Sequence, residues 1–228
     1  MEKKPGGFID PALVEWVPEA GIQGLYAKTL SRCENTGSYT RLLKFLPGTD
    51  TSPAGIQSHH HLEELWIVSG AIYDLVLEQN FVEGMYANRL HHMDHGPWRS
   101  RRGAITFELR DMDADRQIAK EQFEFFDPSL LPWDKVDVRA GIYVKTLTEC
   151  PRTGSYGRLV RFRPGASRPT FGGSDGFSEL WIVSGVLSTV TGETVQPRGT
   201  YGNLEVNLLD GSWTSPVGCT VLEVRNRI

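Results

Sequence analysis

The chain has 228 residues, 39% of them hydrophobic and 23% charged, which is typical of a globular protein with enough apolar residues for a core. The formal net charge of −4 argues against a nucleic-acid surface, and no stretch approaches the ~20 apolar residues of a membrane helix. The N-terminus lacks the apolar run of a secretory signal, and three cysteines without a CxxC spacing argue against a disulfide framework. We therefore expect a cytoplasmic protein with neither nucleic acid nor membrane as a partner.

The chain repeats itself. Asp10–Trp16 matches Asp127–Trp133 at an offset of 117 residues, and Glu64–Gly70 recurs unchanged as Glu179–Gly185 at an offset of 115. The second copy is therefore two residues shorter ahead of Glu179. Each copy is long enough to fold as its own domain. We expect a first domain over residues 8–110, a charged linker over 111–124 that matches nothing in the other half, and a second domain over 125–228.

Both copies have the patterns of β-structure. Leu65–Val68 is a short apolar run followed by Ser69–Gly70, which predicts a strand that ends in a turn. Ile105–Arg110 alternates apolar with polar residues, which predicts a half-buried strand, and Thr220–Arg225 keeps the same phase. Many short strands with turns at short intervals predict an all-β sandwich, barrel or jelly roll.

The histidines distinguish the two copies. All six lie in the first copy, at positions 59, 60, 61, 91, 92 and 95. The second copy has other residues where a metal site would need ligands: Ser174 for His59, Ser178 for Glu63 and Asp210 for His95. Because the second copy keeps the strand pattern without any imidazole, the histidines indicate a site rather than a role in the scaffold.

These residues resemble the cupin superfamily, and within it the ChrR-like cupins, named for the metal-binding domain of a bacterial anti-sigma factor. Pro47-Gly48 is followed by Gln57-Ser58-His59-His60-His61-Leu62-Glu63 and then by Gly70, as in the first cupin motif. The second motif resembles His95-Gly96-Pro97-Trp98 and the residues up to Gly103. The chain departs from the pattern at Gln57, where the family has a histidine. The resemblance implies two tandem cupin jelly-roll barrels, a bicupin.

The resemblance also implies one divalent transition metal in the first barrel. Imidazole and carboxylate ligands suit Fe, Mn, Ni or Zn. We expect Gln57, His59, Glu63 and His95 to bind the metal, with an amide oxygen from Gln57 in the place of the missing histidine. His61 is the alternative ligand, because it also lies two residues from His59 on the same side of an extended chain. A solvated histidine loop without metal is the remaining alternative.

Four residues near the second motif are candidates for contacts behind the metal ligands or with a substrate: His91, His92, Trp98 and Arg99. A position on the solvated surface is the alternative for the two histidines and for Arg99.

Three functions stay open, since cupins host many activities. The first is a small-molecule metalloenzyme of the dioxygenase type, the second a ChrR-like sensor or anti-sigma-related regulatory module, and the third a non-catalytic binding bicupin. The first repeat begins near residue 8 and leaves no room for a helical zinc domain, so we do not expect a sigma factor as a partner. The expected partners are a small-molecule ligand and a second copy of the chain in a homodimer. Catalytic residues, substrate and reaction are not predicted.

Overall fold

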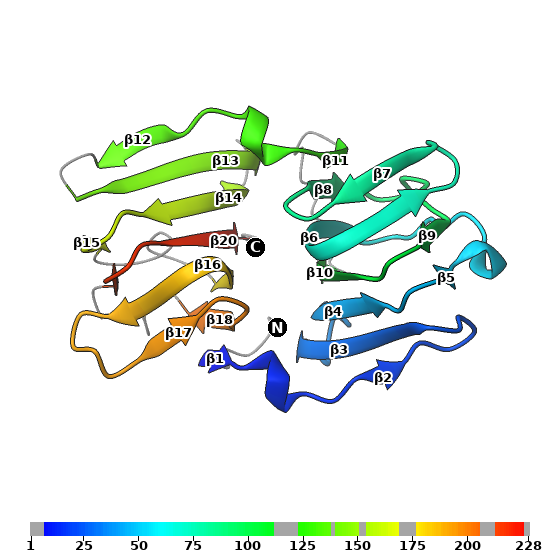
Figure 1. The fold of residues 1–228 in the computed structure, drawn as a ribbon, viewed down its shortest axis with the longest axis horizontal. Helices are drawn as coiled ribbons and strands as arrows, with labels where there is room; N and C mark the ends of the chain where they lie inside the picture. The colour runs from blue at the N-terminus through cyan, green and yellow to red at the C-terminus, as the bar shows by residue number, and fades with distance from the viewer. Residues whose placement is uncertain are drawn as a thin grey trace. The chain divides into compact units, whose positions relative to one another are not determined.

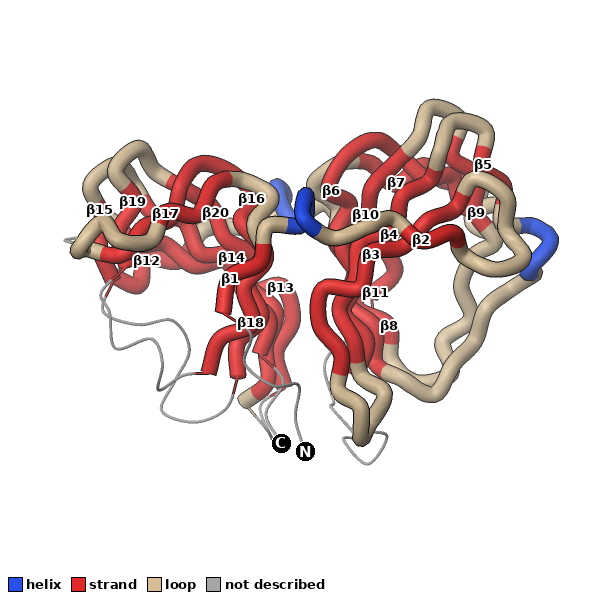
Figure 2. The backbone as a smooth tube through the Cα atoms, turned by 90° about the horizontal axis from the view of Figure 1, so that it is seen from below, coloured by secondary structure: helices blue, strands red, loops and turns tan. Residues whose placement is uncertain are grey.

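The structure is a computed structural model that describes residues 7–111, 123–137, 140–150, 154–168, 177–205 and 213–225. Within these ranges the only helical segments are three short 3-10 turns, which Figure 2 shows among strands and loops: η1 (Pro11–Leu13), η2 (Ser52–Ala54) and η3 (Pro128–Leu130). The predicted all-β class is confirmed. No helix in the described part of the chain is long and apolar enough to cross a membrane.

The strands belong to two compact units (Figure 1). Unit 1 contains residues 14–111 and 123–128, and unit 2 contains residues 7–13 together with the described residues from 129 onward. Residues 112–122 of the predicted linker lie outside the described residues, while Asp111 ends strand β10 and Phe123 begins strand β11. Strand β11, which follows most of the predicted linker, therefore belongs to unit 1. Strand β1, at the N-terminal end of the described chain, belongs to unit 2.

Unit 1 is a ten-stranded antiparallel sheet with the main order β11-β8-β6-β10-β4-β3-β2. Strand β6 is long enough to serve two parts of this sheet: its first half pairs with β8 and β10, and its second half pairs with β7 and β9. Strand β9 also pairs with β5. The strands are β2 (Val17–Pro18), β3 (Leu25–Arg32), β4 (Tyr39–Phe45), β5 (Thr49–Asp50), β6 (Leu62–Asp74), β7 (Gln79–Val82), β8 (Tyr86–Arg89), β9 (Trp98–Ser100), β10 (Ala104–Asp111) and β11 (Phe123–Phe126).

Unit 2 repeats this topology with the main order β1-β18-β16-β20-β14-β13-β12. Strand β17 pairs with β16, and β19 pairs with β15 and β16, so β16 has the role that β6 has in unit 1. The N-terminal strand β1 occupies the edge position that β11 occupies in unit 1. The strands are β1 (Gly7–Ile9), β12 (Asp134–Asp137), β13 (Ile142–Cys150), β14 (Ser155–Phe162), β15 (Ala166–Arg168), β16 (Phe177–Thr189), β17 (Val195–Pro197), β18 (Tyr201–Glu205), β19 (Trp213–Ser215) and β20 (Cys219–Arg225).

The predicted turn at Ser69–Gly70 is wrong, because β6 continues through these residues. The register of β6 against β10 shifts here, as in a β-bulge. Gly70 has φ +74°, and a Cβ atom on it would lie 2.2 Å from the carbonyl oxygen of Gly103. Gly185 in β16 has the same conformation, with the corresponding distance to the Gly218 oxygen at 2.0 Å. The close backbone approach excludes a side chain, which explains why both copies have glycine at this position.

The predicted strand at residues 105–110 is confirmed by β10, but the expectation that it is half-buried is wrong. Phe107 and Leu109 are buried on one face, as predicted, but Thr106 and Glu108 on the opposite face are also buried. The polar face of β10 therefore points into unit 1 and not into solvent. Buried charge of this kind needs ion-pair partners, and the site described below supplies them.

Each unit has its own apolar core. The core of unit 1 includes Leu43, Ile67, Ile72, Phe81 and Ala87. The core of unit 2 is built from equivalent strands and includes Val160, Ile182, Leu187, Leu204 and Val221.

Candidate metal site and adjoining cavity

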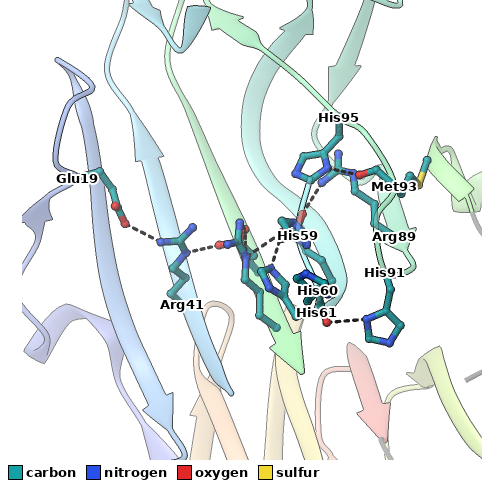
Figure 3. A network of polar contacts seen from close by, with 12 residues as sticks. Glu19, Arg41, His59, His60, His61, Arg89, His91, Met93 and His95 are labelled. Carbon is teal, nitrogen blue, oxygen red and sulfur yellow. Dashed lines mark hydrogen bonds and ion pairs between the residues drawn. The ribbon is translucent and has the colours of Figure 1, made fainter. Parts of the chain in front are cut away.

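Backbone pairing brings two histidine-bearing segments together. The Gln57 N–H donates to the His95 carbonyl at 2.9 Å, and the His95 N–H donates to the Gln57 carbonyl at 3.0 Å. Two residues further along the first segment, the His59 carbonyl accepts a hydrogen bond from the His92 N–H at 2.9 Å. As a result the His59 and His95 rings lie side by side, with centroids 4.7 Å apart (Figure 3).

Three side chains converge where this segment enters β6. His59 and His61 lie in the loop and bend just ahead of β6, and Glu63 is the second residue of that strand. The distance from His59 Nε2 to Glu63 Oε2 is 3.1 Å, and that from His61 Nε2 to the same oxygen is 3.9 Å. The two imidazole rings stack with centroids 3.5 Å apart. One ligand atom from each of the three residues lies within 4.8 Å of the others, so they form a candidate metal site.

Two buried nitrogens of this group have no hydrogen-bond partner among the described residues: His59 Nδ1 and His61 Nε2. A buried polar atom without a partner is costly, and such atoms in native proteins commonly face a ligand, a water or an ion. Imidazole nitrogen and carboxylate oxygen are ligands that first-row transition metals prefer. The residues present therefore fit a divalent transition metal.

The protonation states also suit a metal. Burial, followed by the positive charge of Arg110, lowers the pKa of His61 to about 3. Burial and Arg89 lower the pKa of His95. Burial alone would raise the pKa of Glu63, but Arg110, a hydrogen bond with His59 and Arg89 outweigh it and hold that pKa well below its usual value. At neutral pH, His61 and His95 are neutral and the carboxyl group is ionised, as metal binding requires.

The predicted ligands do not all converge. His59 and Glu63 are in contact, and the predicted alternative His61 lies with them. The Gln57 side chain is exposed, and its amide nitrogen donates to the Ala54 carbonyl at 2.7 Å and not to this group.

His95 is buried beside His59, and its ring is oriented by the backbone. Its Nδ1 lies 2.8 Å from the Met93 carbonyl oxygen (Figure 3). Because a carbonyl can only accept, Nδ1 carries the proton, which leaves the Nε2 lone pair available as a ligand.

His91 and His92 lie away from the three converging residues. His91 Nδ1 is 2.7 Å from the backbone oxygen of His60, which holds the loop closed (Figure 3). His92 is exposed, and its ring packs edge-on against that of His60, with centroids 4.2 Å apart. Both residues therefore contact His60 and not the three converging side chains.

Trp98 and Arg99 point to opposite sides of β9. The Trp98 ring stacks near His95 with centroids 5.5 Å apart, and its Nε1 donates to Asp74 at 2.8 Å. The Arg99 side chain is more than half exposed and pairs with Asp50 at 2.7 Å. Trp98 therefore belongs to the surroundings of the site, whereas the observed partner of Arg99 is on the surface.

A row of charges crosses the sheet behind the candidate ligands. Glu63 on β6 is the direct cross-strand neighbour of Arg89 on β8 and of Arg110 on β10. Arg89 Nη1 contacts Glu63 Oε1 at 2.5 Å, and Arg110 Nε contacts Oε2 at 2.8 Å. Both carboxylate oxygens thus accept from a guanidinium group, and Arg89 is fully buried. Such charge-assisted contacts orient Glu63 firmly.

The row continues as an ion-pair chain of alternating sign. Arg110 Nη2 pairs with Glu108 at 2.6 Å, Glu108 also pairs with Arg41 Nε, and Arg41 Nη1 pairs with Glu19 at 2.6 Å. Including the two contacts of Glu63, the ion-pair chain runs Glu19, Arg41, Glu108, Arg110, Glu63, Arg89. It accounts for the buried polar face of β10.

A cavity of about 590 Å³ lies within unit 1 and is lined in part by these charges. Its polar wall includes five members of the ion-pair chain together with Tyr39, Thr106 and Gln57. Its apolar wall includes Leu25, Leu43, Phe45, Leu65, Ile72, Trp98 and Phe125. Since Arg89 and Arg110 both contact Glu63 and line the cavity, the candidate metal site and the cavity share a wall.

The sequence interpretation missed Arg89 and Thr106, although the repeat contains the signal for both. At the offset of 115 residues, Arg89 corresponds to Leu204 and Thr106 to Val221. Both equivalents are apolar core residues of unit 2. The first copy therefore differs from the second at polar positions in the cavity wall as well as at the histidines.

Comparison with known proteins finds a family match for the first half of the chain. Residues 5–110 match the family model described as ChrR Cupin-like domain. No curated protein matches the chain.

Several solved structures share the fold. A putative dioxygenase from Nostoc punctiforme has a TM-score of 0.75 at 15% identity, with 96% of this chain and 82% of that chain covered. A cupin 2 conserved barrel domain protein from Leptotrichia buccalis has a TM-score of 0.64 at 12% identity, with 98% of both chains covered. Oxalate decarboxylase from Lactobacillus farciminis, in a formate complex, has a TM-score of 0.65 at 11% identity, with 100% of this chain and 88% of that chain covered. At these identities the likeness concerns the fold alone.

Proposed function

We propose that the chain is a metal-binding bicupin that acts as a small-molecule metalloenzyme of the dioxygenase type. The premise is that residues 5–110, which match the family model described as ChrR Cupin-like domain, form a cupin domain. In this proposal the two units are tandem jelly-roll barrels, and unit 1 alone holds a metal. The observation that carries it is the convergence of His59, His61 and Glu63 beside the cavity, with two imidazole nitrogens that have no described partner.

His59, Glu63 and His95 would hold the metal, and His61 is the fourth candidate in preference to Gln57, whose amide is bound to the 54–55 turn. With imidazole and carboxylate ligands and open positions, a divalent metal supplies Lewis-acid chemistry, and ferrous iron supplies oxygen chemistry. Iron, manganese, nickel and zinc all suit this ligand set.

The residues of the chain have separate tasks in this proposal. Arg89 and Arg110 fix both oxygens of Glu63, and the Met93 carbonyl fixes the tautomer of His95. The apolar part of the cavity wall would exclude water from a small substrate held next to the ligands.

The first experiment is metal analysis by mass spectrometry on protein purified without a histidine tag. We expect about one equivalent of iron, manganese, nickel or zinc in the parent protein, and its loss in His59→Ala and His95→Ala, because each removes an imidazole ligand. Parallel His61→Ala and Gln57→Ala variants decide between the two candidates for the fourth ligand.

His60→Ala is the matched control, because His60 belongs to the same triplet but is exposed and contacts His92 instead. It should keep the full metal content. The proposal is wrong if the parent protein binds none of the four metals after reconstitution, or if His59→Ala retains its metal.

A ChrR-like sensor or regulatory module is the second candidate, and the family match supports it. Oxygen uptake separates the two functions: the iron-loaded protein is tested with small diketones and hydroxy-aromatic compounds. Metal binding without oxygen uptake across the panel would favour the regulatory module or a non-catalytic binding role. Recovery of a sigma factor with the protein from cell extract would favour the regulatory module specifically.

A further inference from the structure

Two strands supply much of the cavity wall in unit 1, because alternate residues of β4 and of β10 line the cavity. The charged residues that they contribute have the same identity in both units: Arg41, Glu108 and Arg110 in unit 1, and Arg158, Glu223 and Arg225 in unit 2. Thr106 differs, since Val221 stands in its place in the apolar core of unit 2. The shared fold therefore accounts for the charges, but it does not require a hydroxyl group at position 106.

The hydroxyl group of Thr106 is buried without a partner. The residue is 1% exposed, and its Oγ1 has no hydrogen-bond partner among the described residues. Its direct cross-strand neighbours are Leu43 on β4 and Ile67 on β6, which are buried residues of the apolar core. An unpartnered hydroxyl in such surroundings lowers stability, and valine would fill nearly the same space without this cost. A hydroxyl group in this position of a cavity wall points to a ligand that pairs with it.

The charged side chains of the cavity wall are already paired with one another or with Glu63. The charged residues that line the cavity and have such an ion-pair partner are Glu19, Arg41, Arg89, Glu108 and Arg110. A charged group on a ligand would need to displace one of these pairs, and breaking a buried pair is costly. An uncharged ligand leaves all of them intact. The wall therefore favours an uncharged ligand.

Thr106 lies at the boundary between the charged and the apolar part of the wall. On the cavity face of β4 and β10, the cross-strand pair Arg41–Glu108 is followed by the pair Leu43–Thr106, and Phe45 follows Leu43 on β4. A ligand whose apolar body contacts the leucine and phenylalanine side chains would place a polar group at its end near Thr106. Because a threonine hydroxyl both donates and accepts, it pairs with either a carbonyl or a hydroxyl oxygen.

From these observations we infer that the cavity of unit 1 binds a small uncharged molecule with an apolar body and a carbonyl or hydroxyl oxygen, and that Thr106 determines specificity through a hydrogen bond to this oxygen. The cavity volume of about 590 Å³ is within the range of small-molecule sites. The inference rests on the proposed function in one respect: it names the class of substrate for the cavity beside the candidate metal site.

The test uses the full chain loaded with Zn²⁺, which is redox-inactive and so avoids turnover. Titrations followed by ligand-observed NMR compare acetophenone with α-methylstyrene and benzyl alcohol with ethylbenzene, two pairs in which a carbon group replaces the oxygen. The ratio of the two dissociation constants within a pair also contains the difference in hydration of the free compounds. The quantity of interest is therefore the change in this ratio between the parent protein and a variant at position 106.

Thr106→Val introduces the residue of unit 2 and should shift the ratio about fivefold or more in favour of the hydrocarbon, because the ligand oxygen loses its partner. Thr106→Ser keeps the hydroxyl and should keep the ratio. Thr49→Val is the matched control, because the Thr49 hydroxyl is buried but already donates to the Gly24 and Leu46 carbonyls at 2.9 and 2.8 Å. Thr49→Val should lower the midpoint of urea unfolding and leave the ratio unchanged, whereas Thr106→Val should raise that midpoint in ligand-free protein.

An unchanged ratio in Thr106→Val would overturn the inference, as would the absence of binding by all four compounds. Tighter binding of benzoate than of acetophenone would overturn the uncharged class. The titrations are repeated on chelator-treated protein, and metal content is measured on the same samples. Bound metal with a ratio that Thr106→Val does not change overturns this inference alone. A ratio that Thr106→Val changes, in a protein that never binds metal, overturns the metal proposal alone.

Discussion

Unit 1 and unit 2 share one sheet topology but differ in what they bury. In unit 1 the row across β8, β6 and β10 is Arg89, Glu63, Arg110. In unit 2 the equivalents of the first two are Leu204 and Ser178, which are again direct cross-strand neighbours. The scaffold therefore tolerates both a charged and an uncharged pair at the same place. The two units therefore differ in the side chains that they bury and not in the order of their strands.

Part of the charged network is nevertheless common to both units. Arg158 Nε pairs with Glu223 at 2.9 Å in unit 2, as Arg41 pairs with Glu108 in unit 1. A pair that both units keep belongs to the fold, whereas Glu63, Arg89, Thr106 and the histidines are particular to unit 1. This distinction assigns the candidate site more sharply than buried charge alone, since the carboxylates of the shared pairs, Glu108 and Glu223, are buried as well.

The largest expected effect comes from Glu63→Ser, which introduces the unit 2 residue. Loss of the carboxylate removes ion pairs from the buried Arg89 and from Arg110, and breaking a buried pair costs about 3–5 kcal/mol. Glu63→Ser/Arg89→Leu restores the Ser178/Leu204 combination and should be clearly more stable than the single variant. Urea unfolding of chelator-treated protein measures both. The single variant Arg89→Leu completes the cycle. If the unfolding free energies lost in Glu63→Ser and in Arg89→Leu simply add in the double variant, the two residues are not coupled and the comparison of units fails.

Much of the fold was predictable because repetition and alternation are visible in the sequence. The two copies, the all-β class and the strand at residues 105–110 follow from local patterns. Two features do not follow from local patterns. The first is the bulge near Ser69–Gly70, where the backbone carbonyl of the distant Gly103 passes close to Gly70. The polar face of β10 is buried because β4 and β6 bring partners for Glu108 and Arg110. Both depend on long-range contacts that a local pattern does not contain.

The site was predictable to a similar degree. The i, i+2, i+4 spacing of His59, His61 and Glu63 anticipates that they share a side if the chain is extended, and the three side chains do converge although residues 60 and 61 form a bend. The choice between His61 and Gln57 as a candidate depends on where the Gln57 amide points, and the nearby 52–55 turn determines that. Arg89 and Thr106 were visible in the alignment of the two copies but only as substitutions, since nothing local marks Arg89 as a partner of Glu63 or Thr106 as part of the cavity wall.

A smaller effect is expected from the tyrosines at equivalent places in the two units. Burial, followed by the charge of Glu223, raises the pKa of Tyr156 to about 12, and its hydroxyl donates to Glu223 at 2.9 Å. Since the folded-state pKa lies above the unfolded value near 10, this stabilisation is complete below about pH 10 and is lost between about pH 10 and 12. Tyr156→Phe should cost about 1–2 kcal/mol at pH 8 and progressively less at higher pH.

Denaturant unfolding at pH 8 and pH 11 measures this difference, and absorbance at 295 nm follows the late ionisation directly. Tyr39→Phe is the matched variant in unit 1. Burial and Glu108 raise the pKa of Tyr39 as well, so its contribution should change with pH in the same direction. A cost of Tyr156→Phe that stays constant from pH 8 to 11 would contradict the assigned hydrogen bond.

The smallest effect is expected at the surface, where the units also differ. Asp50 on β5 is paired in register with Arg99 on β9 in unit 1, and Ser167 is paired with Thr214 in unit 2. The Asp50–Arg99 ion pair is substantially exposed, and exposed pairs contribute about 0–1 kcal/mol. Asp50→Ser/Arg99→Thr should therefore change the free energy of unfolding by less than about 1 kcal/mol and leave the metal content unchanged. A loss of metal in this variant would contradict the surface role assigned to Arg99, because Trp98, on the opposite side of β9, is the residue that lies beside His95.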